Sequence, residues 1–164
     1  MLPSSIIHSP EMPWQIHEDK LDSPAVLALL REHLATLAPT APAESRHALD
    51  LSGLRAPGVT FWSIWRGDEL AGFGALKQLS ADHGEVKSMR TAAPFLRQGA
   101  ASAMLQHIID EARRRGYVRL SLETGAMAFF EPAHRLYRSF GFVECEPFGP
   151  YRPDPNSTFM TLAL

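Results

Sequence analysis

The chain has few cysteines and no pattern of metal ligands. Cys145 is the only cysteine among 164 residues, which excludes an internal disulfide and a metal site built from several cysteines. The seven histidines show no paired spacing typical of ligands, so we expect no metal. A chain without disulfides suits a reducing compartment, and we therefore expect a cytoplasmic protein.

Long hydrophobic segments and strong charge are also missing. No apolar run approaches the length needed to cross a bilayer, and the first residues lack the basic and apolar segments of a signal peptide. The formal net charge is only −2, so no general attraction to nucleic acid or to an anionic membrane is expected. We expect neither a nucleic-acid partner nor a membrane partner.

The composition is that of one folded domain. Apolar residues make up 45% and charged residues 21%, and this length can bury a substantial core. Residues 1–13 contain prolines and no hydrophobic period, which predicts an extended lead-in. We assign residues 14–164 to a single domain.

Hydrophobic periodicity and turn residues predict alternating strands and helices. Strands are expected at 14–18, 60–65, 70–79, 83–91, 117–122, 142–145 and 158–162, and helices at 23–36, 99–116 and 131–141. Residues 44–54 are ambiguous, with a short helix favoured over a loop. The segment 83–122 reads as strand, helix and strand, which predicts two parallel strands joined by a right-handed crossover.

The start of the helix at residue 99 has an open backbone. Its residues, Gln98-Gly99-Ala100-Ala101-Ser102, are small or unbranched. The first N–H groups of a helix lack internal partners and carry partial positive charge, so a phosphate can bind there when no side chain blocks it. We predict that this turn holds the pyrophosphate of a nucleotide-like cofactor. The three arginines at 113–115 are interpreted as a cationic helix end.

Two motifs give the chain a family resemblance. Residues 96–101 read LRQGAA, close to the pattern Gln/Arg-x-x-Gly-x-Gly/Ala, and residues 133–142 read AHRLYRSFGF, close to Ala-x-x-Leu-Tyr-x-x-x-Gly-Phe. In this order they resemble the GNAT superfamily of acetyl-CoA-dependent N-acetyltransferases, over about residues 61–142. A Lys-Ser-Met-Arg-Thr strand and a Leu-Glu-Thr-Gly segment are similar to a bacterial subgroup. Leu96 replaces the usual Gln or Arg, and Phe130 stands where many members have Asn.

The resemblance implies an α/β fold (an α+β mixed sheet) that is mostly antiparallel, with flanking helices. Its fourth and fifth strands would form a central parallel pair that splays to admit the pantetheine of acetyl-CoA. Strand alternation places Glu85, Lys87, Met89 and Thr91 on one face, and Val86, Ser88 and Arg90 on the other. The cofactor-binding residues implied are Met89, Arg90, Thr91, Leu96, Arg97, Gln98, Gly99, Ala100, Ala101, Ser102, Phe130 and Tyr137.

Acetyl transfer to an amine needs a base for the amine and an acid near the leaving sulfur. The resemblance implies Glu85 as the base, although a strand glutamate paired with Lys87 is the simpler interpretation. It implies Tyr137 as the acid, although Tyr137 also suits an ordinary core aromatic. Glu123 is an alternative base or a substrate-orienting group, or else faces water.

Two further residues bear on the substrate and on the route. His47 either lines the substrate pocket or caps a surface segment. Cys145 is expected to be a buried small residue, and nothing near it indicates an activated nucleophile. We therefore expect direct attack in a ternary complex and no covalent acetyl-enzyme.

The expected function is transfer of acetyl from acetyl-CoA to a primary amine of a small molecule. The oligomeric state is left open, and the resemblance suggests a homodimer. One alternative is a nucleotide-binding α/β protein, although the P-loop and dinucleotide patterns are missing. A second alternative is a non-catalytic module that binds or senses acetyl-CoA.

Overall fold

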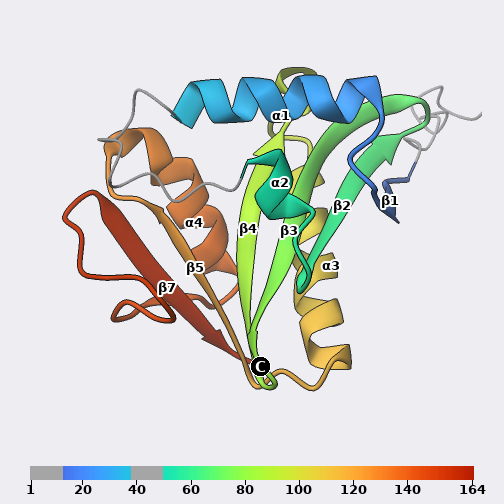
Figure 1. Cartoon of the computed structure of the whole chain (residues 1–164). Helices are drawn as coiled ribbons and strands as arrows, with labels where there is room; N and C mark the ends of the chain where they lie inside the picture. The colour runs from blue at the N-terminus through green and yellow to red at the C-terminus, as the bar shows by residue number, and fades with distance from the viewer. Residues whose placement is uncertain (1–12, 38–49) are drawn as a thin grey trace, which may run out of the picture.

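A computed structural model describes residues 13–37 and 50–164 of the protein. In this part of the chain a seven-stranded sheet has the order β1-β2-β3-β4-β5-β7-β6 (Figure 1). Its strands are β1 Gln15–Glu18, β2 Val59–Arg66, β3 Glu69–Ser80, β4 His83–Thr91, β5 Arg119–Gly125, β6 Val143–Glu144 and β7 Ser157–Ala163. The helices are α1 Pro24–Leu37, α2 Leu51–Leu54, α3 Ala100–Arg114 and α4 Glu131–Ser139, with short 3₁₀ turns at η4 Ala93–Phe95 and η5 Ala128–Phe130.

The sheet is mixed, as the sequence predicts. β4 and β5 pair in parallel, and every other neighbouring pair of strands is antiparallel. The crossover between the parallel strands is α3, so the strand–helix–strand prediction for residues 83–122 is confirmed. Among the described residues, no helix is long and apolar enough to cross a membrane.

The helices cover both faces of the sheet (Figure 1). On one face, α3 and α4 bury the larger apolar cluster, which includes Trp62, Leu76, Met104 and Leu122. On the other face, α1 and α2 bury a smaller cluster around Phe61 and Phe73. β2 and β3 therefore send side chains into both cores, which is the pattern expected where a sheet is covered on both sides.

The ends of α1 and α2 follow from local capping. The hydroxyl of Ser23 accepts a hydrogen bond from the Val26 N–H at 3.2 Å, and Pro24 occupies the first turn, as predicted. The Asp50 carboxylate caps α2 by accepting from the Gly53 N–H at 2.9 Å. Only this last part of the segment 44–54 is described, and it is helical there as expected.

One face of α3 packs into the core. Its buried residues are Ala100, Met104, Leu105, Ile108, Ile109 and Ala112. They recur at intervals of three and four residues, as expected for one face of a helix. The helix is followed by Gly116 at φ +82°, the left-handed conformation that glycine readily adopts after a helix end.

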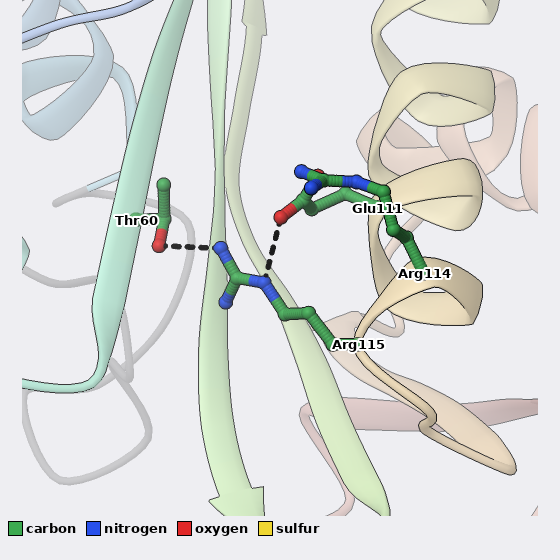
Figure 2. A network of polar contacts seen from close by, with 4 residues as sticks. All are labelled: Thr60, Glu111, Arg114 and Arg115. Atoms are coloured by element: carbon green, nitrogen blue, oxygen red, sulfur yellow. Dashed lines mark hydrogen bonds and ion pairs between the residues drawn. The ribbon is translucent and has the colours of Figure 1, made fainter.

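The C-terminal end of α3 is tied to the sheet by a polar network (Figure 2). The Glu111 carboxylate accepts hydrogen bonds from Arg114 and, at 2.8 Å, from Arg115. The Arg115 guanidinium also donates to the Thr60 hydroxyl of β2 at 2.9 Å. This cationic helix end therefore has structural partners, in agreement with its interpretation from the sequence.

A β-bulge in β4 corrects the predicted faces of that strand. Lys87 pairs with Ala75 and Arg90 pairs with Phe73, so Ser88 and Met89 together lie opposite Gly74. Ser88 has φ +56°, and this extra residue reverses the alternation that follows it. The Met89 side chain packs in the α3 core, whereas Arg90 reaches Glu32 of α1 at 2.9 Å. The prediction that Met89 shares a face with Glu85 and Lys87 is therefore wrong.

Burial of His33 under α1 generates a test of the fold. The ring is 6% exposed and packs edge-on against Phe73 at 5.6 Å between centroids. Burial, together with the positive charge of Arg90, lowers the pKa of His33 to about 4. Between this value and the ordinary histidine pKa of 6.5 the unfolded chain binds a proton that the folded chain does not, so stability falls as the pH falls.

We expect this histidine alone to cost up to about 3 kcal/mol of unfolding free energy between pH 7 and pH 4. His33→Leu should flatten the dependence, as measured by urea unfolding at pH 7 and pH 5. The matched control is His17→Leu on exposed β1, which should leave the dependence unchanged. An equally steep loss in the His33 variant would contradict the account.

Candidate active site

β4 and β5 separate in the middle of the sheet. Their parallel pairing runs from His83 opposite Arg119 to Val86 opposite Leu122 and ends there. Beyond this point β4 continues to Thr91 and β5 to Gly125, and Figure 1 shows the two strands diverging toward α1. The bulge at Ser88 lies just past the last pair, and a bulge bends the strand that carries it. Backbone groups of both strands are thereby released from the ladder beside Glu85.

The predicted phosphate turn lies beyond the far end of β4. Residues 96–99 form an exposed turn, and α3 begins at Ala100. Gly99 caps the helix in the left-handed conformation, at φ +92° and ψ +4°, and Arg97 is also left-handed at φ +63°. Leu96, which stands in place of the usual polar residue, is 56% exposed. The turn therefore offers an accessible backbone and a helix N-terminus, which is the arrangement that suits an anion.

The side chain of Gln98 holds this turn in place. Its carbonyl oxygen accepts from Arg66 at 2.9 Å, and its amide donates to the Pro94 carbonyl at 2.9 Å. The Arg66 guanidinium in turn lies 3.8 Å above the Trp14 ring, and Trp14 packs edge-on against Phe95. The contribution of Gln98 to a ligand site would therefore come from its backbone.

Glu85 lies in a buried polar cluster at the point where the strands part. It is 2% exposed, and its Oε2 accepts from the Tyr151 hydroxyl at 2.5 Å and from Lys87 Nζ at 3.3 Å. Lys87 Nζ also donates to the Tyr151 hydroxyl at 2.8 Å. The pairing of Glu85 with Lys87 that the sequence suggests is present, and Tyr151 completes a three-membered network.

Tyr151 is the member of this network that the sequence analysis missed. It comes from the proline-rich loop between β6 and β7, more than 60 positions from Glu85 in the chain. Its ring packs against Phe148 at 5.1 Å and Phe159 at 5.5 Å. A tyrosine among prolines in a long connection is the only available signal, because no local pattern places that loop over β4.

Tyr137 and Glu123 interact electrostatically. Tyr137 of α4 is buried in the core and stacks edge-on against Phe142. Burial and, secondarily, the negative charge of Glu123 raise the pKa of Tyr137 above its ordinary value, so its hydroxyl stays protonated. Glu123 is half-buried, and its charge also contributes to the raised pKa of Tyr151, after burial and Glu85. The structure thus brings Glu85, Glu123, Tyr137 and Tyr151 to one region.

The remaining predicted site residues are more dispersed. Phe130 packs against the end of β5, where a Cβ added to Gly125 would lie 2.1 Å from its ring. His47 lies outside the described residues. Cys145 is half-buried and not fully buried as expected, and partial burial raises the pKa of its thiol. Among residues 13–37 and 50–164 no group of His, Cys, Asp or Glu side chains could hold a metal ion.

Comparisons with known proteins agree with this geometry. The family described as Acetyltransferase (GNAT) matches residues 25–142. The N-acetyltransferase YsnE of Bacillus subtilis (strain 168) is 60% identical over 146 residues, which cover 89% of this chain and 97% of YsnE.

Solved structures share the whole fold. An acyl-CoA N-acyltransferase from Klebsiella pneumoniae is 28% identical, with a TM-score of 0.76, over 92% of this chain and 97% of its own. A GNAT family acetyltransferase from Elizabethkingia anophelis, solved with acetyl-CoA bound, is 20% identical, with a TM-score of 0.67, over 92% and 98% of the two chains. The parted parallel strands, the open helix N-terminus and these similarities lead to one conclusion: the chain belongs to the GNAT acetyltransferase family and is an N-acetyltransferase.

Proposed function

We propose that the protein transfers the acetyl group of acetyl-CoA to a primary amine of a small molecule, by direct attack within a ternary complex. One observation carries the proposal: the gap between β4 and β5 opens directly beyond Glu85, and the exposed turn before α3 lies beyond the far end of β4. A thioester arm between the strands would thus bring its reactive carbonyl beside Glu85, while its phosphates bind the turn.

The cofactor would be held mainly by backbone groups. Met89, Arg90 and Thr91 lie past the last β4–β5 pair, so their N–H and C=O groups can pair with an amide-bearing arm. The turn of residues 96–99 and the first turn of α3, through Ser102, would bind the pyrophosphate. Phe130, against the end of β5, would flank the cofactor. The acetyl-CoA bound to the Elizabethkingia protein of the same fold supports this choice of cofactor.

The chemistry would be shared between two side chains. The amine nitrogen attacks the thioester carbon, the carboxylate of Glu85 receives the amine proton, and the C–S bond breaks with its electron pair on sulfur. Tyr137 would donate a hydrogen bond, and then a proton, to that sulfur. The raised pKa of Tyr137 ensures that a proton is present to donate. Direct attack also agrees with Cys145, since a thiol with a raised pKa is a poor nucleophile at neutral pH.

Two alternatives stay within the same geometry. Glu123 is half-buried near both tyrosines and could serve as the base in place of Glu85. A sensing module would bind acetyl-CoA without transfer. Acetyl-CoA should raise the Tm of an enzyme and of a sensing module alike, whereas release of CoA thiol with a panel of amines is expected only of an enzyme.

Replacing Glu85 by Gln tests the base. The amide keeps the shape of the buried side chain and removes the proton acceptor, so we expect kcat to fall about 10²–10⁴-fold at neutral pH. Glu123→Gln is the matched control and should lose far less. A larger loss in the Glu123 variant would assign the base to Glu123.

Tyr137→Phe tests the acid. The ring contact with Phe142 is kept, so the Tm and the Kd for acetyl-CoA should change little. Without the hydroxyl, kcat should fall about 10²-fold, as followed by thiol release. An unchanged kcat would remove Tyr137 from the mechanism.

Two glycines that flank α3, Gly99 and Gly116, separate cofactor binding from helix stability. Gly99→Ala and Gly116→Ala both force a Cβ into a left-handed conformation, with open space around each position, so each should cost about 1 kcal/mol of stability. Only Gly99→Ala should also weaken acetyl-CoA binding, because it alters the turn proposed to bind the pyrophosphate. Calorimetric titration measures the affinity of each variant for acetyl-CoA. Equal affinities would contradict a phosphate site at this turn.

A further inference from the structure

The burial of Glu85 raises a question about how an amine proton reaches it. The side chain is only 2% exposed, and the oxygen facing the polar cluster, Oε2, is already hydrogen-bonded to Tyr151 and Lys87. Because the Tyr151 hydroxyl is hydrogen-bonded to the buried carboxylate, a proton can reach Glu85 most directly through that hydroxyl. The 2.5 Å separation between Tyr151 Oη and Glu85 Oε2 is within the range of a short O–H···O⁻ hydrogen bond.

The hydrogen-bond directions around Tyr151 suit such a transfer. The ammonium of Lys87 can only donate, so the Tyr151 oxygen accepts from it at 2.8 Å. The Tyr151 hydroxyl then donates its single proton to Glu85. A phenol oxygen has two lone pairs, so it can accept from an incoming amine as well as from Lys87, and Tyr151 is half-buried whereas Glu85 is buried.

We propose that Tyr151 is a catalytic residue that passes the proton of the acceptor amine to Glu85. This inference rests on the proposed function and on Glu85 as the base. As the amine nitrogen forms its bond to the thioester carbon, an N–H bond breaks and the proton joins Tyr151 Oη. The original Tyr151 proton moves to Glu85 Oε2, so the tyrosine ends neutral. The C–S electron pair leaves with the sulfur.

Lys87 and the local electrostatics define how this step proceeds. Burial and the neighbouring Glu85 raise the pKa of Tyr151, so a free phenolate is not a resting state and the two proton movements occur together. The Lys87 ammonium donates to the Tyr151 oxygen, on which negative charge develops during the transfer. Lys87 is therefore a positioning residue that orients the lone pairs of Tyr151.

A purely structural role for Tyr151 makes different predictions. The same hydroxyl could anchor the β6–β7 loop to β4, while the ring packs between Phe148 and Phe159. Loss of an anchor would lower the Tm and change the KM for the amine, but would leave the proton path intact. Tyr151→Phe keeps the ring and removes only the hydroxyl, so it separates the two roles.

The experiment measures single-turnover rates with acetyl-CoA and an amine that the wild-type enzyme accepts. Tyr151→Phe should slow transfer about 10²-fold at neutral pH with unchanged acetyl-CoA affinity. The double variant Glu85→Gln with Tyr151→Phe should be no more than about threefold slower than Glu85→Gln alone, because the two groups act as one unit. Tyr117→Phe, which removes the hydroxyl of another buried tyrosine, is the matched control and should stay near the wild-type rate.

A second readout does not depend on the stability of the variant. In mixtures of H₂O and D₂O, the wild-type rate should curve with the deuterium fraction because two protons move together, and a linear dependence would overturn the relay. If Tyr151→Phe reacts within about threefold of the wild-type rate while Glu85→Gln is slow, the relay is overturned. Glu85 would then remain the base. If the wild type releases no CoA thiol with any amine, the proposed function itself fails.

Discussion

The end of the pairing between β4 and β5 is the constraint on which the rest of the site depends. Up to Val86 and Leu122 the two strands share a regular parallel ladder. The bulge at Ser88 then makes β4 diverge, and the unpaired backbone beyond it becomes available to a ligand. Exposed strand backbone is usually a liability, because it can pair with another chain. Here the parting lies in the middle of the sheet, where α1, α3 and α4 surround it and a cofactor arm can complete the pairing.

Glycines on the neighbouring strand make this bulge possible. A Cβ on Gly72 would lie 2.3 Å from the Arg90 carbonyl oxygen, and one on Gly74 would lie 2.9 Å from the side chains of Met89 and Met104. The divergence of β4 therefore depends on the two glycines of β3 as well as on the bulge in β4.

The polar cluster at the gap concentrates opposite charges in a small volume. Glu85 and Lys87 are both buried and 3.3 Å apart, and an isolated charge in their place would be costly. Their mutual contact and the Tyr151 hydroxyl satisfy several of their hydrogen-bonding groups. Such a cluster is weak evidence for stability, because desolvation offsets much of the attraction. Its position beside the opening accords with a role in proton transfer.

Sequence patterns predicted the order of the elements, the parallel pair and the exposed turn at Gly99, because each depends on local periodicity or on a short motif. They did not predict the face of Met89, since a single extra residue at Ser88 reverses the alternation and leaves no compositional trace. They also missed Tyr151, whose contact with Glu85 joins segments 66 residues apart through a loop without periodicity. Leu96 and Phe130 are the two departures from the family pattern. Leu96 lies in an exposed turn that would bind a ligand through its backbone, and the Phe130 ring packs on Gly125.

The most direct test of this account is a crystal structure of the protein with CoA. We expect the pyrophosphate on the backbone of Gly99, Ala100 and Ala101, and the sulfur between β4 and β5, within hydrogen-bond distance of the Tyr137 hydroxyl. A CoA molecule bound with its sulfur away from this gap, or with its phosphates away from the start of α3, would contradict the account.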